Sequence, residues 1–228
     1  METDVFSVSN IYKRQGDFLL DSVSLSAMNN DIIGLIGDNG AGKTTFLKII
    51  ASLISIDSGE SNLPLQEKIG VVFDQLPFPG SLSIYELEKV MKRLFSTWEA
   101  EKFHNYINLF KLPLKTPVKK FSKGMSMKLN IAVSLSHQAQ ILLLDELTSG
   151  LDPLVRIDIL QLIQDYVREN NATVVMSTHI LDDIDKIATK VVLMHNGKFV
   201  LQKEMKDIPD MHYLEKKFKE ILEKQGEN

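Results

Sequence analysis

Residues 32–45 read IIGLIGDNGAGKTT, and this stretch decides the fold of the 228-residue chain. Residues 32–36 are apolar apart from one glycine, as in a short buried strand, and residues 37–44 match the pattern GxxxxGK[ST]. In that pattern a glycine-rich loop leads from a strand into a helix, and its backbone N–H groups point at phosphate oxygens. The helix dipole adds positive charge at the same place. The stretch therefore predicts a nucleoside-phosphate site on a strand–loop–helix unit.

The loop and the start of its helix supply the groups expected to hold a nucleoside triphosphate. Lys43 provides a mobile positive charge for the β- and γ-phosphates, the Thr44 hydroxyl is placed to bind Mg²⁺, and Thr45 is placed to contact the α-phosphate. The residues expected to touch the nucleotide are Gly37, Asp38, Asn39, Gly40, Ala41, Gly42, Lys43, Thr44 and Thr45.

Two acids follow a second apolar run. Ile141–Leu144 leads directly into Asp145 and Glu146. Because ligands of open α/β sheets bind at the carboxyl ends of the strands, both carboxylates are expected to face the phosphates. Asp145 is predicted to hold Mg²⁺, and Glu146 is predicted to orient and polarise the water that attacks the γ-phosphate.

The order of patterns along the chain predicts an α/β fold with a largely parallel sheet. An alternating N-terminal part, residues 5–26, indicates an antiparallel β-region, and Asn196-Gly197 between two apolar runs indicates a hairpin. We expect one domain over residues 1–228, with a helical lobe at about 76–135 and a helical tail at about 203–228. The buried strands are predicted at Ile32–Ile36, Ile69–Phe73, Ile141–Leu144 and Thr173–Met176.

Composition excludes several classes of function. The net charge is −4 with a pI near 5.8, which does not favour a nucleic-acid binder that relies on a broad basic field. The absence of cysteine excludes disulfides and thiolate metal sites. No apolar run reaches the roughly 18 to 20 residues that a membrane span needs, so we expect a cytoplasmic protein.

Three further motifs separate this chain from other nucleotide-binding proteins. Residues 121–125, FSKGM, resemble the LSGGQ signature of ATP-binding-cassette (ABC) ATPases. Residues 147–153, LTSGLDP, resemble the D-loop of that family, and Ser177-Thr178-His179 resembles its switch histidine. The chain is therefore similar over essentially its whole length to an ABC transporter ATPase of the exporter-type branch. A kinase or small GTPase would leave the signature and the histidine unexplained.

The resemblance implies specific roles. Ser122 and Gly124 contact the γ-phosphate bound to the opposite subunit, His179 senses that phosphate, and Asp152 with Ser149 links the two sites. Lys43, Glu146 and His179 form the implied catalytic set.

Two of the implied positions stay open between neighbours. Either Asp74 or Gln75 meets Mg²⁺ and the water at the Q-loop. The aromatic side chain that stacks on adenine is Tyr12, with Phe18 as the second candidate. Departures from the family pattern are Lys123, Met125 and Leu147.

The implied function is ATP hydrolysis that powers transport, with export favoured. The partners are a second cassette and a separate integral membrane subunit, which places the chain on the inner face of the membrane. We expect residues 76–80 to expose apolar side chains to that subunit. The alternative is a non-transport cassette acting on ribosomes or nucleic acid; the chain lacks the second cassette and the coiled-coil insertion of such members.

Overall fold

The computed structural model describes residues 4–73, 76–149 and 151–223. Asp74 and Gln75, the two Q-loop candidates, and Gly150 of the D-loop motif lie outside these ranges. Within them, no helix combines the length and the hydrophobicity needed to cross a bilayer.

The centre of the molecule is a six-stranded sheet with the order β5-β6-β7-β3-β8-β9. The first five of these strands are parallel, and β9 runs antiparallel to β8 across the predicted Asn196-Gly197 turn. The predicted α/β class with a largely parallel sheet is confirmed. The strands are β3 (Ile32–Gly37), β5 (Ile69–Val72), β6 (Ile141–Asp145), β7 (Thr173–Thr178), β8 (Lys190–His195) and β9 (Lys198–Glu204).

A separate antiparallel sheet of β1 (Phe6–Gln15), β2 (Phe18–Ala27) and β4 (Ser58–Asn62) forms the N-terminal β-region. The sequence patterns indicate β1 and β2 but not β4, whose residues SGESN are all exposed and show no apolar alternation. Strand β4 forms because its backbone pairs with β1, a long-range contact that leaves no periodic signal.

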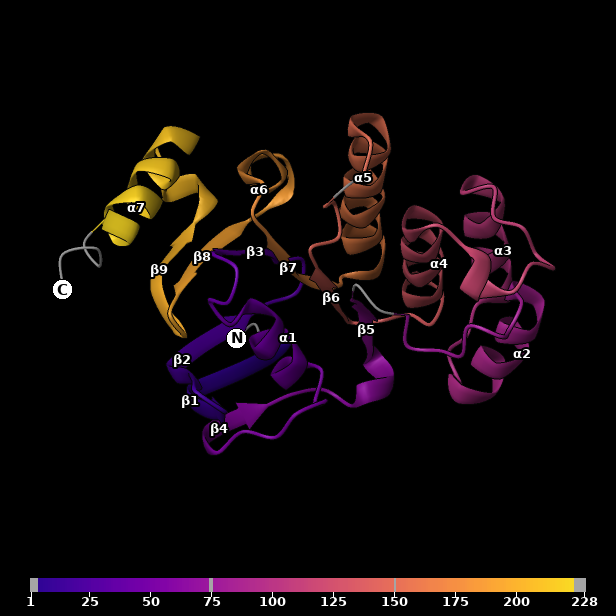
Figure 1. Cartoon of the computed structure of the whole chain (residues 1–228), viewed down its shortest axis with the longest axis horizontal. Coiled ribbons are helices and arrows are strands. Elements are labelled where there is room, and N and C mark those ends of the chain that lie inside the picture. The colour runs from indigo at the N-terminus through magenta and orange to yellow at the C-terminus, as the bar shows by residue number, and fades with distance from the viewer. Residues whose placement is uncertain (1–3, 74–75, 150, 224–228) are drawn as a thin grey trace.

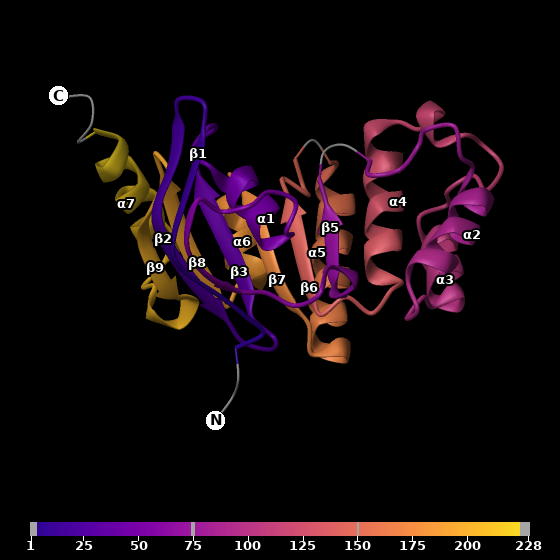
Figure 2. The same cartoon turned by 90° about the horizontal axis from the view of Figure 1, so that it is seen from below.

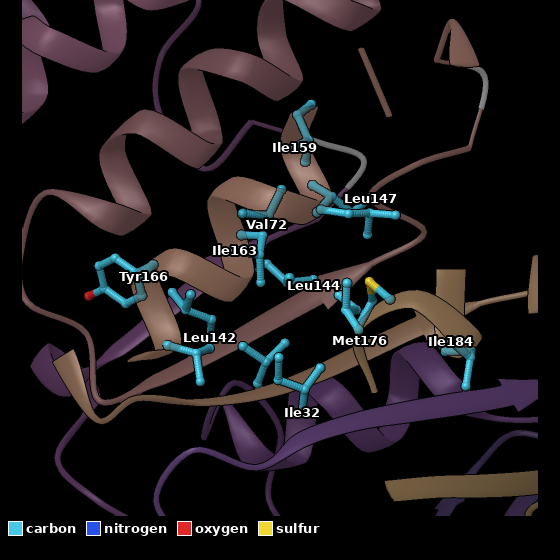
Figure 3. Packing of buried hydrophobic residues seen from close by; sticks show 14 of the residues in the cluster. Ile32, Val72, Leu142, Leu144, Leu147, Ile159, Ile163, Tyr166, Met176 and Ile184 are labelled. Carbon is cyan, nitrogen blue, oxygen red and sulfur yellow. The ribbon is translucent and has the colours of Figure 1, made fainter. Parts of the chain in front are cut away.

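Helices cover both faces of the large sheet (Figures 1 and 2). On one face lie α5 (Pro153–Asn170), α6 (Leu181–Ile187) and α7 (Met211–Glu223), and on the other lie α1 (Lys43–Ile50) and the antiparallel sheet. The strands are therefore buried on both sides. In β6, Leu142 and Leu144 join the core beneath α5, shown in Figure 3, whereas Ile141 and Leu143 join the core beneath α1.

A group of helices with its own apolar core lies at one end of the sheet, consisting of α2 (Ile84–Leu94), α3 (Ala100–Leu109) and α4 (Lys123–Leu135). Helix α4 connects this lobe to the sheet, because its residues contribute to the lobe core and to the core beneath α5. Phe78 is only 9% exposed and packs in the lobe core, so the expectation that residues 76–80 present it to a partner is wrong. The Phe78 ring is buried because packing it among the apolar side chains of the lobe removes its surface from water, which is favourable.

The C-terminal part begins its helix later than predicted. Residues 203 and 204 still pair with β8 as the end of β9, and a short 3₁₀ turn, Met205–Asp207, precedes α7. Helix α7 is anchored by Leu214, which is 3% exposed in the core beneath α5.

Candidate active site

The glycine-rich loop lies between β3 and α1. Gly42 caps α1 with φ 110°, a left-handed conformation that a side chain would strain. A Cβ on Gly42 would also lie 2.5 Å from the Phe18 ring. The hairpin supports the loop from behind, since the Gly197 N–H donates to the Ala41 carbonyl at 2.9 Å. The first N–H groups of α1 are thus available to an anion.

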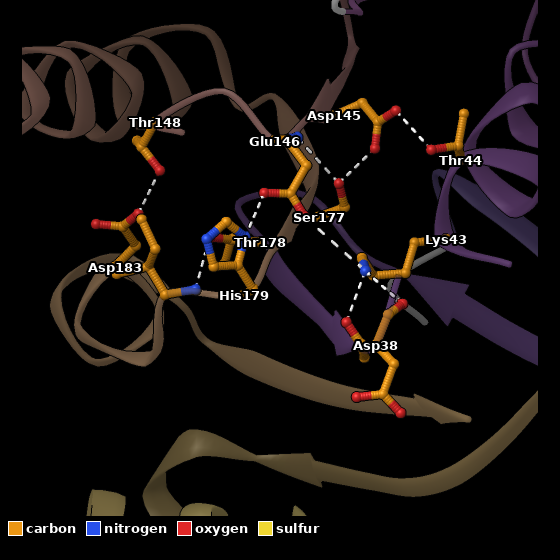
Figure 4. Close-up of polar contacts among 12 residues, drawn as sticks. Asp38, Lys43, Thr44, Asp145, Glu146, Thr148, Ser177, Thr178, His179 and Asp183 are labelled. Atoms are coloured by element: carbon orange, nitrogen blue, oxygen red, sulfur yellow. Dashed lines mark hydrogen bonds and ion pairs between the residues drawn. The ribbon is translucent and has the colours of Figure 1, made fainter. Parts of the chain in front are cut away.

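Lys43 lies inside the loop and is 6% exposed. Its Nζ donates to the carbonyl oxygens of Gly37 at 2.6 Å and Asp38 at 3.0 Å, and it lies 3.9 Å from Glu146 Oε1. Burial lowers the pKa of Lys43, and the charges of Glu146, Asp145 and Asp38 oppose this shift. The loop therefore holds a partly desolvated cation next to the carboxylates, as Figure 4 shows.

Asp145 and Thr44 meet across the loop. The Thr44 hydroxyl donates to Asp145 Oδ2 at 2.7 Å, and the Ser177 hydroxyl donates to Asp145 Oδ1 at 2.5 Å. Both predicted metal ligands are hard oxygen donors, as Mg²⁺ requires. Neighbouring oxygens around an octahedral Mg²⁺ lie about 3 Å apart, and the 2.7 Å between Thr44 and Asp145 is close to that separation. The pair therefore fits the predicted ion.

The backbone of Glu146 is strained, and two hydrogen bonds to Ser177 hold it in place. Its φ is 51°, which is uncommon outside glycine, and its N–H donates to the Ser177 carbonyl at 3.1 Å and hydroxyl at 3.0 Å. The Glu146 side chain points back toward the glycine-rich loop, and its Oε2 lies 2.7 Å from His179 Nδ1. The structure thus brings Lys43, Asp145, Glu146 and His179 together.

A cavity of about 390 Å³ lies along the loop. Phe18, the second candidate for contact with the base, lines it, whereas Tyr12 does not. A hydrogen bond to Asp21 and the charge of that carboxylate raise the pKa of Tyr12. The base contact stays a prediction, with Tyr12 and Phe18 as the two candidates. The complete lining is Gln15, Phe18, Asp38, Asn39, Gly40, Gly42, Lys43, Thr44, Thr45, Asp145 and Glu146.

The signature residues lie at the start of α4. Ser122 is its N-cap, with the hydroxyl accepting from the Met125 N–H at 3.2 Å, and Gly124 has no neighbour within 4 Å of where a Cβ would be. Neither residue lines the cavity. Lys123 lines an adjoining cavity with Glu146, His179 and Ser149. Asp152 is exposed at the N-cap of α5.

Some side chains in and around the site were given no role by the motifs. Asp183 is fully buried on α6, where it accepts from the Thr148 hydroxyl at 2.5 Å and pairs with Arg156 of α5. Ser177 touches both acids, and its place directly before Thr178-His179 was the available signal. Gln15 accepts from the Thr45 hydroxyl at 3.3 Å, a contact that no sequence pattern announces.

Comparison with known proteins identifies the family. A family model described as ABC transporter matches residues 20–149. The chain belongs to the ABC transporter family. The resemblance seen in the sequence is confirmed, and the chain is one of the ATP-hydrolysing cassettes of that family.

Relatives of this ABC cassette include two transport ATP-binding proteins. The lantibiotic transport ATP-binding protein SrtF of Streptococcus pyogenes is 32% identical over 210 residues, which cover 88% of this chain and 91% of the relative. The bacitracin transport ATP-binding protein BcrA of Enterococcus faecalis is 29% identical, covering 95% of this chain and 74% of the relative.

Solved structures share the fold. The ATP-binding subunit of an ABC transporter superposes with a TM-score of 0.82 at 22% identity, covering 90% of this chain and 91% of that one. A dimeric ATP-binding cassette in a post-hydrolysis state superposes with a TM-score of 0.78 at 21% identity, covering 88% of this chain and 98% of that one. At these identities the likeness concerns the fold, which is the ABC ATPase fold predicted from the sequence.

Proposed function

We propose that this cassette hydrolyses ATP between two copies, or between one copy and a related cassette, to power export through a separate membrane subunit. One observation carries the proposal: Lys43, Thr44, Asp145 and Glu146 line one cavity, whereas Ser122 and Gly124 lie outside it at the N-terminal end of α4. A second body that brings its own α4 to this cavity would complete the site.

The contacts support a division of labour in the hydrolytic step. Lys43 and the first N–H groups of α1 bind the β- and γ-phosphates. Glu146 accepts the proton of a water whose oxygen attacks the γ-phosphorus, while the bond between the γ-phosphorus and the bridging oxygen breaks and ADP leaves. His179 holds the Glu146 carboxylate in position through the 2.7 Å contact and lies where it can also reach the γ-phosphate.

Thr44 and Asp145 are the residues that would hold Mg²⁺. When bound, the ion neutralises negative charge on the β- and γ-phosphates. The Ser177 hydroxyl, which donates to Asp145 at 2.5 Å, keeps that carboxylate at the carboxyl end of β6. Asp74 and Gln75 remain alternatives for a further contact to the ion and the water.

Dimerisation follows from the two helix starts. Ser122 is the exposed N-cap of α4 and the space at Gly124 is open, so this helix N-terminus has room for an anion. In a head-to-tail pair this N-terminus would contact the γ-phosphate held by the partner's loop. Asp152 and Ser149, beside the acidic pair, would lie at the same contact. Loss of the γ-phosphate would then open the pair.

The proposals on transport and on cellular location rest on similarity to known relatives. SrtF and BcrA are named as lantibiotic and bacitracin transport ATP-binding proteins, which supports export of an antibiotic-like cargo. The membrane-spanning part would be another polypeptide, and this chain would lie against it on the cytoplasmic face. These relatives give no support to action on ribosomes or nucleic acid.

A mass measurement tests the proposal. The Glu146→Gln variant should bind ATP without hydrolysing it, so saturating ATP and Mg²⁺ should double the 25.8 kDa mass in light scattering after size exclusion. Adding Lys43→Ala to the same variant should keep it monomeric, because nucleotide binding is lost. A Glu146→Gln protein that stays monomeric at saturating ATP would contradict pairing of identical copies, and ATP turnover equal to wild type would contradict the role of Glu146.

A further inference from the structure

The glycine-rich loop carries a negative charge of its own at Asp38. This residue lines the cavity along the loop and the adjoining cavity, and its backbone carbonyl accepts from Lys43 Nζ at 3.0 Å. A carboxylate close to a bound triphosphate repels it, and the repulsion grows as the separation falls. In Figure 4 the Asp38 carboxylate points away from Lys43. The position in which this side chain is held therefore affects nucleotide affinity.

His195, the last residue of β8, holds the Asp38 carboxylate. Its Nδ1 lies 3.1 Å from Asp38 Oδ2, and an ionised carboxylate only accepts hydrogen bonds, so the Nδ1–H group is the donor. The His195 side chain is 10% exposed, against 35% for Asp38. The carboxylate therefore takes the position that the buried ring gives it. Because His195 lines neither cavity, any effect that it has on a nucleotide passes through the loop.

The hairpin of β8 and β9 also supports the loop backbone. The Gly197 N–H donates to the Ala41 carbonyl at 2.9 Å. At the start of the loop, a Cβ on Gly37 would lie 2.2 Å from the Met194 carbonyl oxygen. Near the end of the loop, a Cβ on Gly42 would lie 2.8 Å from Met194 Cε. The hairpin therefore contacts the loop along its length.

The same hairpin is fastened to β2. Its Gly197 carbonyl accepts from the Asp21 N–H at 2.8 Å, and Lys198 Nζ lies 2.8 Å from Asp21 Oδ2. A Cβ on Gly197 would lie 1.9 Å from the Leu19 carbonyl oxygen, so the two backbones are in close contact. A loop that is held in its binding shape before the ligand arrives loses less conformational freedom on binding. The antiparallel sheet thus braces the glycine-rich loop through the hairpin.

We infer that His195 is a positioning residue for nucleotide binding: through Asp38 it keeps the glycine-rich loop preformed and turns the carboxylate away from the phosphates. The inference rests on the proposed function, because that function places phosphates on the loop. Nucleotide affinity then depends on the His195 donor. The hydrolytic step, which uses Glu146 and the groups around it, does not.

Calorimetric titration of the full chain with MgADP tests the inference, because ADP occupies the loop without turnover. Two variants separate the hydrogen bond from the packing of the ring. His195→Phe keeps a ring without a donor and should raise the Kd about five- to tenfold, as expected for one lost hydrogen bond. His195→Asn keeps an N–H donor without the ring and should stay within about twofold of wild type. A role in packing alone would give the opposite order.

Two further measurements show whether His195 acts through Asp38 and on binding alone. In steady-state ATP hydrolysis, His195→Phe should raise KM by a similar factor and leave kcat within about twofold. In the Asp38→Ala background, adding His195→Phe should change the Kd for MgADP by less than about twofold, because the partner of the donor is already gone.

Three results would overturn the inference: equal MgADP affinities in the two His195 variants, weaker binding in His195→Asn than in His195→Phe, or a full loss of affinity when His195→Phe is added to Asp38→Ala. A fall in kcat at unchanged KM would do the same. The proposed function would still stand if wild type binds MgADP and hydrolyses ATP. Failure of wild type to bind MgADP would overturn both.

Discussion

The Thr148 hydroxyl donates a 2.5 Å hydrogen bond to Asp183 Oδ2, and the other carboxylate oxygen of Asp183 pairs with the Arg156 guanidinium. Thr148 lies two residues after Glu146, and Asp183 lies four residues after His179. This buried pair therefore ties the loop that follows the catalytic acid to the helix that follows the histidine, as Figure 4 shows for Thr148 and Asp183. The 2.7 Å contact between Glu146 and His179 joins the same two segments.

Asp183→Asn should destabilise the fold by about 3 kcal/mol, because it leaves the partly buried Arg156 charge without its partner. Urea unfolding measures the change in the free energy of unfolding. The neighbouring Asp182→Asn is the control, since Asp182 is exposed and its loss should cost less than about 0.5 kcal/mol. Equal stability of the two variants would show that the buried pair contributes nothing.

The Gly124→Ala variant should fold normally but be impaired in the pairing of two cassettes. A Cβ at Gly124 meets nothing within 4 Å in its own chain, and alanine favours a helix over glycine by up to about 1 kcal/mol, so stability should hold or rise. If the second cassette places a γ-phosphate here, the added methyl should lower ATPase activity at least about tenfold while ATP binding is kept. Steady-state turnover and calorimetry measure the two effects. Ser126→Ala, two residues further along α4, is the control and should retain activity.

Gly197→Ala should be far more costly than Gly16→Ala, although both glycines have positive φ. A Cβ at Gly197 would lie 1.9 Å from the Leu19 carbonyl oxygen, whereas a Cβ at Gly16 meets nothing within 4 Å. Gly16→Ala should therefore lose only the conformational term of about 1 kcal/mol, and Gly197→Ala more than about 3 kcal/mol. Chemical denaturation compares them. Similar losses of stability in the two variants would mean that the β8–β9 hairpin can shift away from β2 to make room for the added methyl group.

Acid should destabilise the lobe through His137. Burial lowers the pKa of His137 to about 4, while the unfolded chain titrates near 6.5, so the unfolded state binds more protons between these values. The neutral form therefore contributes about 3 kcal/mol of stability above pH 6.5, and this is lost as the pH falls toward 4. Unfolding curves at several pH values measure the slope.

His137→Phe is the matched variant for the pH series. The stability of this variant should depend less on pH between pH 6.5 and 4, because a phenyl ring does not titrate. The fold should be kept, because the His137 ring stacks on Phe95 with 4.2 Å between centroids and a phenyl ring can keep that contact. An unchanged slope in this variant would assign the acid sensitivity to other groups.

Local patterns in the sequence determined much of this protein. The strand, loop and helix around Lys43, the acids at the end of β6 and the Asn196-Gly197 hairpin were all predictable. Each is encoded by neighbouring residues whose burial period, glycine content or turn chemistry acts over a few positions. The parallel sheet followed because strands buried on both faces read as continuous apolar runs.

Tertiary structure alone decided which distant side chains share a site. Strand β1 shifts register on both sides of Ile11, so simple alternation cannot show that Gln15 reaches Thr45. The burial of Phe78 in the lobe and the pairing of Thr148 with Asp183 likewise depend on segments far apart in the chain. A sequence encodes such contacts only through the packing of the whole core, because no local period records which element will lie opposite.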